Sequence, residues 1–334
     1  MLRSFSMKIA ALLPHVEIYG GVRRYLEIGN ELVLRGHSFA LFHPLGSPPQ
    51  WLEFKGKTKP FSSLKEESFD VALCSEYSIL PYFEKLKART RFFYFLLEGH
   101  RMEKEVIKRN YHFLGNSEGI CERIRKKYKK DCLKAAGGVN PEIFYPLKKE
   151  HKTREFRILC YGRVYKKRKG VRRVIKAVEK LHKKYPYLRL VFFDSLVGEE
   201  KKDPREMIET SVPHEFHLNL PQTRMAWLYA QGDIFVSAER RAGWSNTTAE
   251  AMACRIPVVC TRSGTRDFAV HRRTALVAPF SYPVFLQYQM EKLIQDERLR
   301  QRLAEEGYKR ILAFTWKTVV DRLETIFTRG AKLN

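Results

Sequence analysis

The sequence of 334 residues contains no apolar run that approaches the roughly 20 residues needed to span a membrane. Residues 1–18 contain only the short apolar run 9–13 and no small-residue cleavage site, which predicts a first strand and not a signal peptide. The six cysteines include no C-x-x-C pair, so we expect buried free thiols instead of a disulfide framework or a zinc site. These absences together predict a cytoplasmic protein.

Acidic residues are scarce relative to basic ones. The chain has 62 Lys and Arg against 37 Asp and Glu, which gives a formal net charge of +25. Such an excess predicts an anionic partner, and phosphorylated small substrates, anionic lipid headgroups and nucleic acid all fit. A lysine-rich surface that adapts a protein to high temperature is a fourth explanation. No nucleic-acid-binding motif is visible, which disfavours nucleic acid as the partner.

The first half of the chain has the pattern of an α/β domain. Residues 8–14 predict a short apolar strand, a loop with Gly20 and Gly21 follows, and Gly36 ends a helical pattern before the strand 38–43. A strand, a helix and a second strand in this order favour a parallel sheet. Further elements are predicted at 70–74, 91–97 and 112–115 as strands and 117–130 as a helix.

A second α/β series follows a charged segment at 146–157, where we expect the linker. The predicted strands are 157–161, 188–194, 215–218, 233–237, 256–260 and 275–278, and the predicted helices include 170–185 and 223–231. We therefore expect domains at 1–148 and 149–314. Apolar residues at helical spacing in the last segment predict a helix at about 315–330 that packs back onto the first domain.

Residues 237–264 are the most informative stretch. They predict a glycine-containing loop, a short helix that begins between Ser245 and Thr248, and the strand 258–260. Backbone N–H groups at a helix N-terminus bind anions, and Glu250 in the first turns could reach a ligand hydroxyl. A phosphate on the amides and a diol on the carboxylate describe a nucleotide-sugar diphosphate. Alternatively, Thr247-x-x-Glu250 is only a capping box that closes the helix end.

Ligands of open parallel sheets bind at the carboxyl ends of the strands. If two such sheets face each other across a cleft, Gly20 and Gly21 of the first domain lie opposite Arg163, Lys169 and Glu250 of the second. This arrangement suits a donor on one side and an acceptor on the other.

Several segments in this order resemble the retaining glycosyltransferases of family 4, and the resemblance spans nearly the whole chain. The segments that carry it are Gly20-Gly21, Asn116-Ser117, Gly138-Val139-Asn140, Tyr161-Gly162-Arg163 with Arg168-Lys169-Gly170, Glu250-Ala251-Met252-Ala253-Cys254 with Ile256-Pro257-Val258-Val259, and Phe314-Thr315-Trp316. The family implies the GT-B fold, which is an α/β architecture of two facing Rossmann-like domains with a central cleft.

The resemblance also implies a donor site for a nucleoside-diphosphate sugar of the UDP or GDP type. Arg163 and Lys169 match the positions that hold the diphosphate, with Arg168 as a substitute. Cationic groups and helix amides stabilise the charge that a departing diphosphate gathers. The remaining donor-binding residues implied are Gly20, Gly21, Gly243, Ser245, Asn246, Thr247 and Glu250. No Asp-x-Asp pair occurs, so we expect neither a metal nor any other cofactor. A solvated basic turn at 166–169 is the alternative.

One position departs from the family pattern. Family members usually carry two glutamates, and Glu250 matches the second, but Ala242 stands in place of the first. The sugar contact could be made by nearby Glu239, the donor preference could be altered, or the enzyme could have lost activity. A sugar-nucleotide-binding protein without transferase activity is therefore one alternative function, and a sugar-nucleotide epimerase is another.

The family implies retention by same-face substitution, in which the leaving phosphate takes the proton of the acceptor hydroxyl. A histidine after a first-domain strand often steadies the sugar; His100 is the candidate and His15 the rival. The acceptor class implied is a glycan or a lipid-linked molecule, as in cell-surface polysaccharide or glycolipid synthesis. The basic segment 121–134 could rest on an anionic membrane and make the protein peripheral to the inner face, or could be an ordinary exposed helix.

Overall fold

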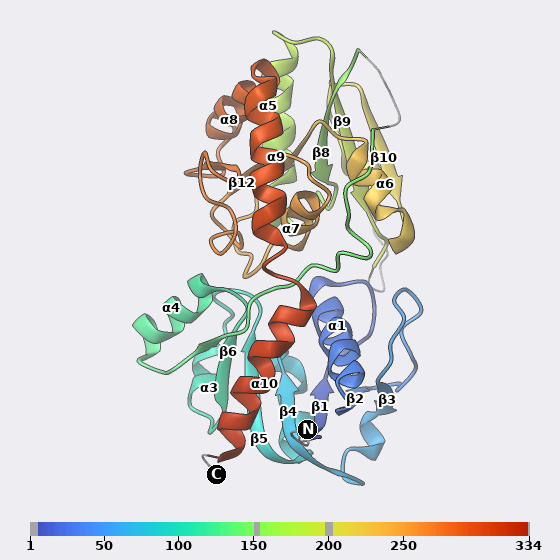
Figure 1. The fold of residues 1–334 in the computed structure, drawn as a ribbon, viewed down its shortest axis with the longest axis vertical. Coiled ribbons are helices and arrows are strands. Elements are labelled where there is room, and N and C mark those ends of the chain that lie inside the picture. Colours follow the sequence, from blue (N-terminus) through green and yellow to red (C-terminus); the bar gives the residue numbers. More distant parts are fainter. Residues whose placement is uncertain (1–5, 150–153, 198–202, 333–334) are drawn as a thin grey trace. The chain divides into compact units, whose positions relative to one another are not determined.

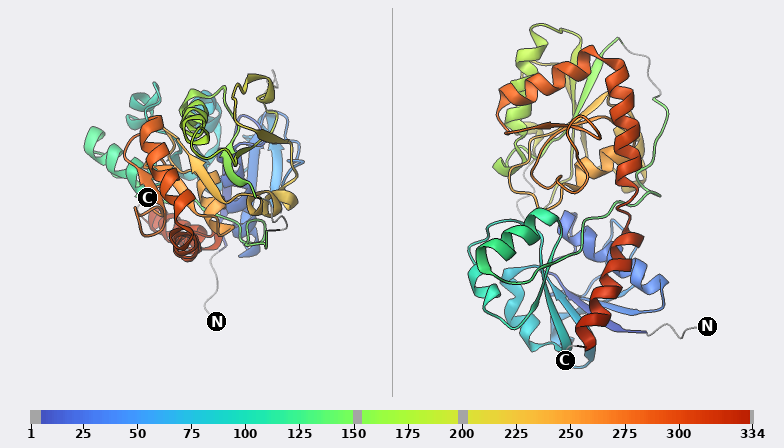
Figure 2. Two further views of the ribbon diagram at one scale, coloured as in Figure 1. Left: turned by 90° about the horizontal axis from the view of Figure 1, so that it is seen from above. Right: turned by 60° about the vertical axis from the view of Figure 1, so that its left-hand side comes forward.

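The computed structural model describes residues 6–149, 154–197 and 203–332. The chain divides into two compact units. Unit 1 comprises 1–138 with 316–334, and unit 2 comprises 139–315. Each unit is built around one parallel sheet with helices packed against it (Figures 1 and 2). The expected α/β class with two Rossmann-like domains is confirmed. None of the described helices is both long and apolar enough to cross a membrane.

The sheet of unit 1 has the strand order β3-β2-β1-β4-β5-β6-β7 and is parallel throughout. Its strands are β1 (Lys8–Leu12), β2 (Ser38–His43), β3 (Lys57–Pro60), β4 (Ser68–Cys74), β5 (Lys87–Phe95), β6 (His112–Gly115) and β7 (Leu133–Lys134). Its α-helices are α1 (Gly20–Leu34), α2 (Leu80–Lys85), α3 (Glu103–Ile107), α4 (Glu118–Tyr128) and α10 (Trp316–Lys332).

Alternate residues of these strands point to opposite faces, as the pleat requires. In β1, Ile9 and Ala11 belong to the core cluster beneath α1 and α10, whereas Ala10 and Leu12 belong to the cluster on the other face with residues of α2, α3 and α4. The strand is apolar on both sides because both faces are covered, which is typical of parallel sheets.

Helix α10 is the last element of the chain but packs against α1 in unit 1. Val320 and Leu323 are fully buried in the core cluster that includes α1. Arg35, which follows α1, donates to Asp321 at 2.7 Å and to Glu324 at 2.5 Å. The apolar stripe of α10 and these ion pairs therefore attach the C-terminal helix to the first sheet.

The sheet of unit 2 has the order β10-β9-β8-β11-β12-β13 and is also parallel. Its strands are β8 (Phe156–Tyr161), β9 (Leu188–Asp194), β10 (His214–Leu218), β11 (Ile234–Ser237), β12 (Val258–Thr261) and β13 (Leu276–Ala278). Its α-helices are α5 (Val171–His182), α6 (Met225–Ala230), α7 (Asn246–Ala253), α8 (Pro283–Gln295) and α9 (Glu297–Ile311). Short 3₁₀ helices cover Phe61–Ser63 and Tyr77–Ile79 in unit 1, and Lys167–Lys169, Arg205–Met207 and Gln222–Arg224 in unit 2.

The division between the units falls before the linker that the charged segment predicted. Val139 donates its N–H to Phe314 at 2.8 Å, and Phe144 is almost fully buried with its ring 6.1 Å from that of Tyr229. The segment after Gly138 therefore joins unit 2, because the backbone of Val139 and the side chain of Phe144 find their partners there. The structure divides the units between Gly138 and Val139, whereas the sequence predicted the boundary at 148/149.

Candidate functional site

The sheet of unit 2 has a topological switch point between β8 and β11. From β8 the chain continues outward through β9 and β10, whereas β11 leads in the other direction through β12 and β13. Crevices for ligands form at the carboxyl ends of such a strand pair, because the two connections leave on opposite faces of the sheet. The loops that follow β8 and β11 contain Arg163, Lys169 and Glu239.

Arg163 is held rigidly at this edge by Asp194, the last residue of β9. Its Nη2 lies 2.7 Å from Asp194 Oδ1, and its Nε lies 3.1 Å from both carboxylate oxygens. The Asp194 carboxylate also accepts the backbone N–H of Ser195 at 2.8 Å. Burial acts to lower the pKa of Arg163, but Tyr161 and Asp194 outweigh it and raise the pKa. The guanidinium is therefore permanently charged and fixed in direction.

Lys169 reaches the same edge from the short 3₁₀ helix before α5. Its Nζ forms an ion pair with Glu239 Oε1 and lies 5.1 Å from the centre of the Tyr161 ring. The following Gly170 has φ +70°, and a Cβ there would come within 2.2 Å of the Ala238 carbonyl oxygen. Only glycine permits this close approach, which brings Lys169 next to the end of β11.

Glu239 is almost fully buried, and its second oxygen Oε2 has no hydrogen-bond partner in the described part of the chain. Leaving a buried charged acceptor unsatisfied is unfavourable by more than the roughly 1–3 kcal/mol of a neutral group. Such an atom at the carboxyl end of a strand is a site where a ligand hydroxyl can donate. The sequence named Glu239 as the alternative sugar contact, and its geometry suits that role.

Helix α7 begins at Asn246, with Ser245 as its N-cap residue. The Ser245 hydroxyl lies 2.7 Å from the Thr248 hydroxyl and does not cap a backbone N–H. Because the helix begins at Asn246, Thr247 lies inside it and is not the N-cap residue. The alternative that Thr247-x-x-Glu250 forms a capping box is therefore wrong. Glu250 is instead mostly buried and accepts a hydrogen bond from the Tyr229 hydroxyl at 2.9 Å. The N-terminal amides of α7 thus lack a side-chain cap from Ser245, as an anion site requires.

The loop before α7 packs tightly against the loop after β12. Ala242 donates its N–H to the Ser263 hydroxyl at 2.8 Å, and Ser245 donates to the Gly264 carbonyl at 2.8 Å. Gly243 is buried in this loop. A Cβ on Gly264 would lie 2.7 Å from the Ala242 Cβ, so the backbone around the altered family position is crowded. Arg168, the substitute for Lys169, is partly buried, and its carbonyl accepts the N–H of Arg240 at 2.9 Å.

The other predicted residues lie at the carboxyl edge of the sheet of unit 1. Gly20 is the first residue of α1, and a Cβ on Gly21 would lie 3.3 Å from Leu96 Cδ1. His100 follows β5, accepts the N–H of Met102 through Nδ1 at 3.1 Å, and stacks on Tyr77 with ring centres 4.0 Å apart.

His15 follows β1 and accepts the N–H of Glu17 through Nδ1 at 3.3 Å. Burial lowers the pKa of His15. The structure brings His15 and His100 to the same sheet edge, and the roles of both remain predictions.

Two partners of the site were missed by sequence reasoning. Asp194, which orients Arg163, is a charged residue at the end of an apolar strand, and that position was a usable signal. Tyr229, which bonds Glu250, comes from α6 and carries no such signal. Among the described residues, no three His, Cys, Asp or Glu side chains come together as a metal site would require.

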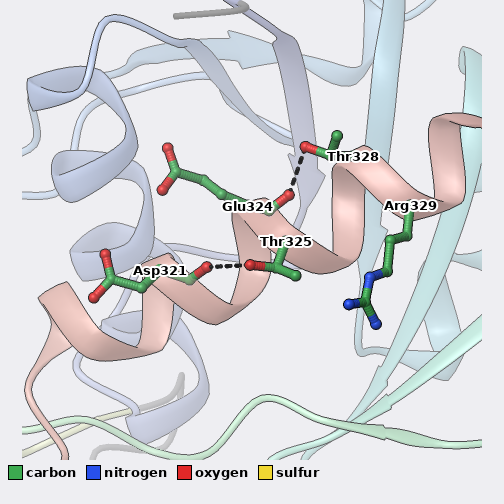
Figure 3. A pocket seen from close by; sticks show the side chains of 5 residues that line it. All are labelled: Asp321, Glu324, Thr325, Thr328 and Arg329. Atoms are coloured by element: carbon green, nitrogen blue, oxygen red, sulfur yellow. Dashed lines mark hydrogen bonds between the residues drawn. The ribbon is translucent and has the colours of Figure 1, made fainter.

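A cavity of about 490 Å³ lies away from both strand edges, on α10 (Figure 3). It is lined by Asp321, Glu324, Thr325, Thr328 and Arg329. The Thr325 and Thr328 hydroxyls donate to carbonyls one turn earlier, at 3.0 and 2.8 Å, and Asp321 and Glu324 bind Arg35. Two of the five lining side chains, Asp321 and Glu324, therefore serve the attachment of α10, and the two threonines bond within the helix itself.

Residues 144–310, half of the chain, match the sequence family described as glycosyl transferases group 1. The capsular polysaccharide biosynthesis glycosyltransferase CapM of Staphylococcus aureus is 26% identical over 174 residues, which cover 51% of this chain and 45% of CapM. An uncharacterized glycosyltransferase of Methanocaldococcus jannaschii is 23% identical over 216 residues, which cover 63% of this chain and 57% of that protein. The chain thus spans about half the length of these curated relatives.

Solved structures match over almost the whole chain. A glycosyltransferase from Rickettsia africae has a TM-score of 0.77 at 15% identity and covers 98% of this chain and 100% of its own. HepE of Anabaena, solved with UDP-glucose, has a TM-score of 0.75 at 13% identity and covers 97% and 100%. These structures confirm the predicted GT-B fold class. With half of its length matched by one sequence family and with this fold, the chain belongs to the group 1 glycosyl transferases.

Proposed function

We propose that the protein transfers a sugar from a nucleoside-diphosphate sugar to an acceptor hydroxyl with retention of configuration and without a metal. The observation that carries this proposal is the convergence of Arg163, Lys169 and the N-terminus of α7 on the carboxyl edge of one sheet. A fixed guanidinium, an ammonium and helix amides are suited to stabilise the negative charge of a departing diphosphate.

The two acidic residues of the site take different roles in this proposal. Glu250 binds the ribose hydroxyls of the donor, and its hydrogen bond from Tyr229 fixes the direction of its carboxylate. Glu239 accepts a hydroxyl of the transferred sugar through its unsatisfied Oε2, and so substitutes for the glutamate that Ala242 replaces. When the diphosphate binds, Lys169 is shared between the phosphate and Glu239, because both anions lie within reach of the same ammonium.

The transfer step needs no enzymatic nucleophile. The acceptor oxygen forms the new bond to the anomeric carbon on the face from which the diphosphate oxygen departs. The acceptor hydroxyl gives its proton to that phosphate oxygen, and nucleoside diphosphate leaves with the bonding electron pair. His100 steadies the sugar in this scheme, and Arg163 and Lys169 stabilise the diphosphate as it departs.

The donor and acceptor classes rest on similarity. HepE was solved with UDP-glucose, which supports a UDP-type donor, and a GDP-type donor is the alternative. CapM acts in capsular polysaccharide biosynthesis, which supports a glycan or lipid-linked acceptor at the inner face of the membrane. A cytoplasmic location, peripheral to that membrane, agrees with such an acceptor.

The first test is a thermal-shift screen with UDP, GDP, ADP and their sugars, with and without EDTA. A ligand that binds only the folded protein raises its melting temperature, by a free energy of about 2.7 kcal/mol at a hundredfold excess over Kd. We expect one nucleotide to stabilise the protein in the presence of EDTA. Release of the same nucleoside diphosphate with an acceptor then establishes transfer. Stabilisation by none of the nucleotides contradicts the proposal.

A second candidate function follows from Ala242. If the protein binds a sugar nucleotide but no longer transfers the sugar, Ala242→Glu should raise donor hydrolysis strongly while nucleotide affinity stays the same. If Glu239 already makes the sugar contact, the same substitution should leave hydrolysis unchanged or lower it, because the loop around Ala242 is crowded.

A further inference from the structure

A cluster of exposed apolar side chains lies on unit 2, on the loop after β13 and on α8. Phe280, Tyr282, Val284 and Tyr288 are 59%, 56%, 57% and 57% exposed. Single exposed apolar residues are common on protein surfaces, but a cluster usually marks a contact surface. The donor-site residues do not include these side chains, so the contact has a different purpose.

Helices α5 and α8 pack side by side and run in the same direction. At their beginnings, the Arg173 guanidinium lies 5.1 Å from the centre of the Tyr282 ring. Just after the end of α5, Lys184 donates to Glu291 of α8 at 2.8 Å. Contacts in the same order at both ends show that the two helices are parallel neighbours.

The exposed rows of the two helices form one continuous surface. Residues three and four apart share a helix face. On α5 this row contains the exposed Lys176 and Lys180 and the partly buried Arg173, and it continues to Lys184. On α8 it contains the exposed Val284, Tyr288 and Gln295 and the partly buried Glu291. Because the Lys184–Glu291 and Arg173–Tyr282 contacts join the rows at both ends, the cations of α5 share one surface with Tyr282 and the row of α8. We call this the α5–α8 surface.

We propose that the α5–α8 surface docks the protein onto an anionic lipid bilayer. Tyrosine and phenylalanine side chains enter the boundary between headgroups and acyl chains, and neighbouring lysines bind the lipid phosphates. Lys292 Nζ lies 3.9 Å from the centre of the Tyr288 ring, which places a cation at the edge of the apolar cluster. The acidic Glu291 of this surface is already paired with Lys184, so its charge does not oppose the lipid.

The basic helix α4 is a weaker candidate for the same contact. Ile120, Cys121 and Ile124 are fully buried in the core of unit 1, so the apolar side of α4 has no surface to offer a bilayer. Two of its arginines are also paired, Arg123 with Glu103 and Arg125 with Glu118. The α5–α8 surface combines exposed apolar groups with cations, whereas α4 presents cations alone.

The aliphatic Val284 also favours a bilayer over nucleic acid. Single-stranded nucleic acid binds by base stacking on aromatic rings, and an exposed valine between Tyr282 and Tyr288 in the sequence adds nothing to that mode. The proposal does not depend on the donor site, because it uses residues of α5, α8 and the loop after β13. Lipid docking can therefore be disproved while the proposed transferase function holds. The transferase function can likewise be disproved while lipid docking holds.

The test is co-sedimentation of the full chain with phosphatidylcholine vesicles that contain about one third phosphatidylglycerol or none. We expect binding only to the anionic vesicles and a fall in binding with rising salt. Neutralising two cations, in Lys176→Gln/Lys180→Gln, should weaken binding roughly thirtyfold. Phe280→Ser/Tyr288→Ser should weaken binding as well, without changing its salt dependence, because it removes apolar contacts only.

The matched control is Lys126→Gln/Lys127→Gln, which removes the same charge from α4. We expect this variant to bind anionic vesicles nearly as well as the wild type. All three variants change exposed side chains, so their melting temperatures and the shift produced by the donor nucleotide should equal those of the wild type. A variant that melts early is replaced by the corresponding single substitution.

A fluorescent label gives a second, independent measurement. The six native cysteines are buried, so a thiol reagent should label an introduced Val284→Cys selectively. A polarity-sensitive dye at that position should shift to the blue with anionic vesicles, and the same dye at Lys127→Cys should not. The proposal is overturned if anionic vesicles do not bind, if the α4 variant loses binding instead, or if single-stranded RNA alone produces the dye shift at position 284.

Discussion

The carboxyl edges of both sheets contain acidic groups that are paired with cations, and the edge of unit 1 also contains an acidic group that burial alone affects. Glu103 of unit 1 is buried and paired with Arg123. In unit 2, Asp194 and Glu239 are each paired with a cation, Arg163 and Lys169. In unit 1, Glu76 follows β4 at the corresponding edge, and burial alone raises its pKa. The described acidic residues beside Arg163 and Lys169 therefore keep full charges in fixed positions, whereas Glu76 at the edge of unit 1 favours the neutral form.

This difference suits the two partners of a transfer reaction. A diphosphate carries charge throughout the reaction and is stabilised by cations that are already oriented. An acceptor alcohol is uncharged, and the carboxyl edge of unit 1 contains histidines, an aromatic ring stacked on His100, and two glycines at the start of α1. The comparison agrees with the proposed donor side in unit 2 and the proposed acceptor side in unit 1, and each of the following changes tests one part of that proposal.

The largest expected effect is on the stability of unit 2. Asp194→Ala leaves the buried Arg163 guanidinium without its carboxylate, and breaking a buried ion pair in this way costs about 3–5 kcal/mol. Urea denaturation measures the loss. The matched control is Glu155→Ala, which removes the partner of Arg189 at the other end of β9, where both side chains are partly exposed. That change should cost about 1 kcal/mol or less.

Arg163 itself should matter most for transfer. Arg163→Ala should lower kcat by about a hundred- to a thousandfold, which is typical for losing one preorganised group that stabilises developing charge. Arg189→Ala, on the same sheet, should leave kcat unchanged. If Asp194 acts only by orienting Arg163, then Asp194→Asn should add little to the kinetic effect of Arg163→Ala in a double-mutant cycle. If the effects of Asp194→Asn and Arg163→Ala on kcat are additive, the positioning role of Asp194 is contradicted.

Glu239 separates binding of the nucleotide from handling of the sugar. Glu239→Gln removes the charge that holds Lys169 but keeps a hydrogen-bond acceptor of the same shape. Transfer should fall by roughly ten- to a hundredfold, as for the loss of a charged hydrogen bond. Affinity for the free nucleoside diphosphate should stay equal or increase, since Lys169 is released for the phosphates. If Glu239→Gln lowers transfer and nucleotide affinity by the same factor, then Glu239 contacts the nucleotide and not the sugar.

Substitutions at the carboxyl edge of unit 1 should affect transfer less than substitutions at the donor side in unit 2. His100→Ala should reduce transfer by tenfold or less, which corresponds to one neutral hydrogen bond, and should leave the affinity for the free nucleotide unchanged. Isothermal titration with the nucleotide and a coupled assay for its release distinguish the two effects. His15→Ala serves as the comparison, because the two histidines compete for the same role. A larger loss in His15→Ala would transfer the role to that residue.

Local patterns in the sequence were sufficient to predict most of the fold. The strands β1, β4, β8 and β9 are apolar runs with turn residues at their ends, and the helix predicted at 170–185 is observed as α5, which begins at Val171 with Gly170 as its N-cap. Elements that local patterns do not specify were missed, notably the edge strand β3. Lys57 and Lys59 make β3 polar, and it is a strand only because β2 lies beside it.

The sequence named the residues of the candidate site but not the residues that pair with them. Arg163 and Lys169 were named from the resemblance of Tyr161-Gly162-Arg163 and Arg168-Lys169-Gly170 to the family pattern, and the structure places both at the carboxyl edge of the sheet of unit 2. Their partners are distant in the sequence: Asp194 is 31 residues from Arg163, and Glu239 is 70 residues from Lys169. These pairs depend on β9 and β11 both lying beside β8, and a single sequence does not specify that strand order.

The smallest expected effect is on stability, and it concerns the carboxyl group of Glu76 in unit 1. The pKa of Glu76 is raised above its usual 4.5 by burial, so the folded protein holds this proton at pH values where the unfolded chain has lost it. Its contribution to stability is therefore complete below about pH 4.5 and is lost as pH rises through the folded-state pKa.

Glu76→Gln cannot ionise and should avoid this loss. The melting temperature of Glu76→Gln relative to the wild type should thus increase as pH rises above 4.5 and then level off. Glu239→Gln is the informative comparison, because Glu239 is paired with Lys169 and should gain no stability at high pH from losing its charge. A pH-independent difference for Glu76→Gln would mean that a cation compensates Glu76 too, and the contrast between the two edges would then disappear.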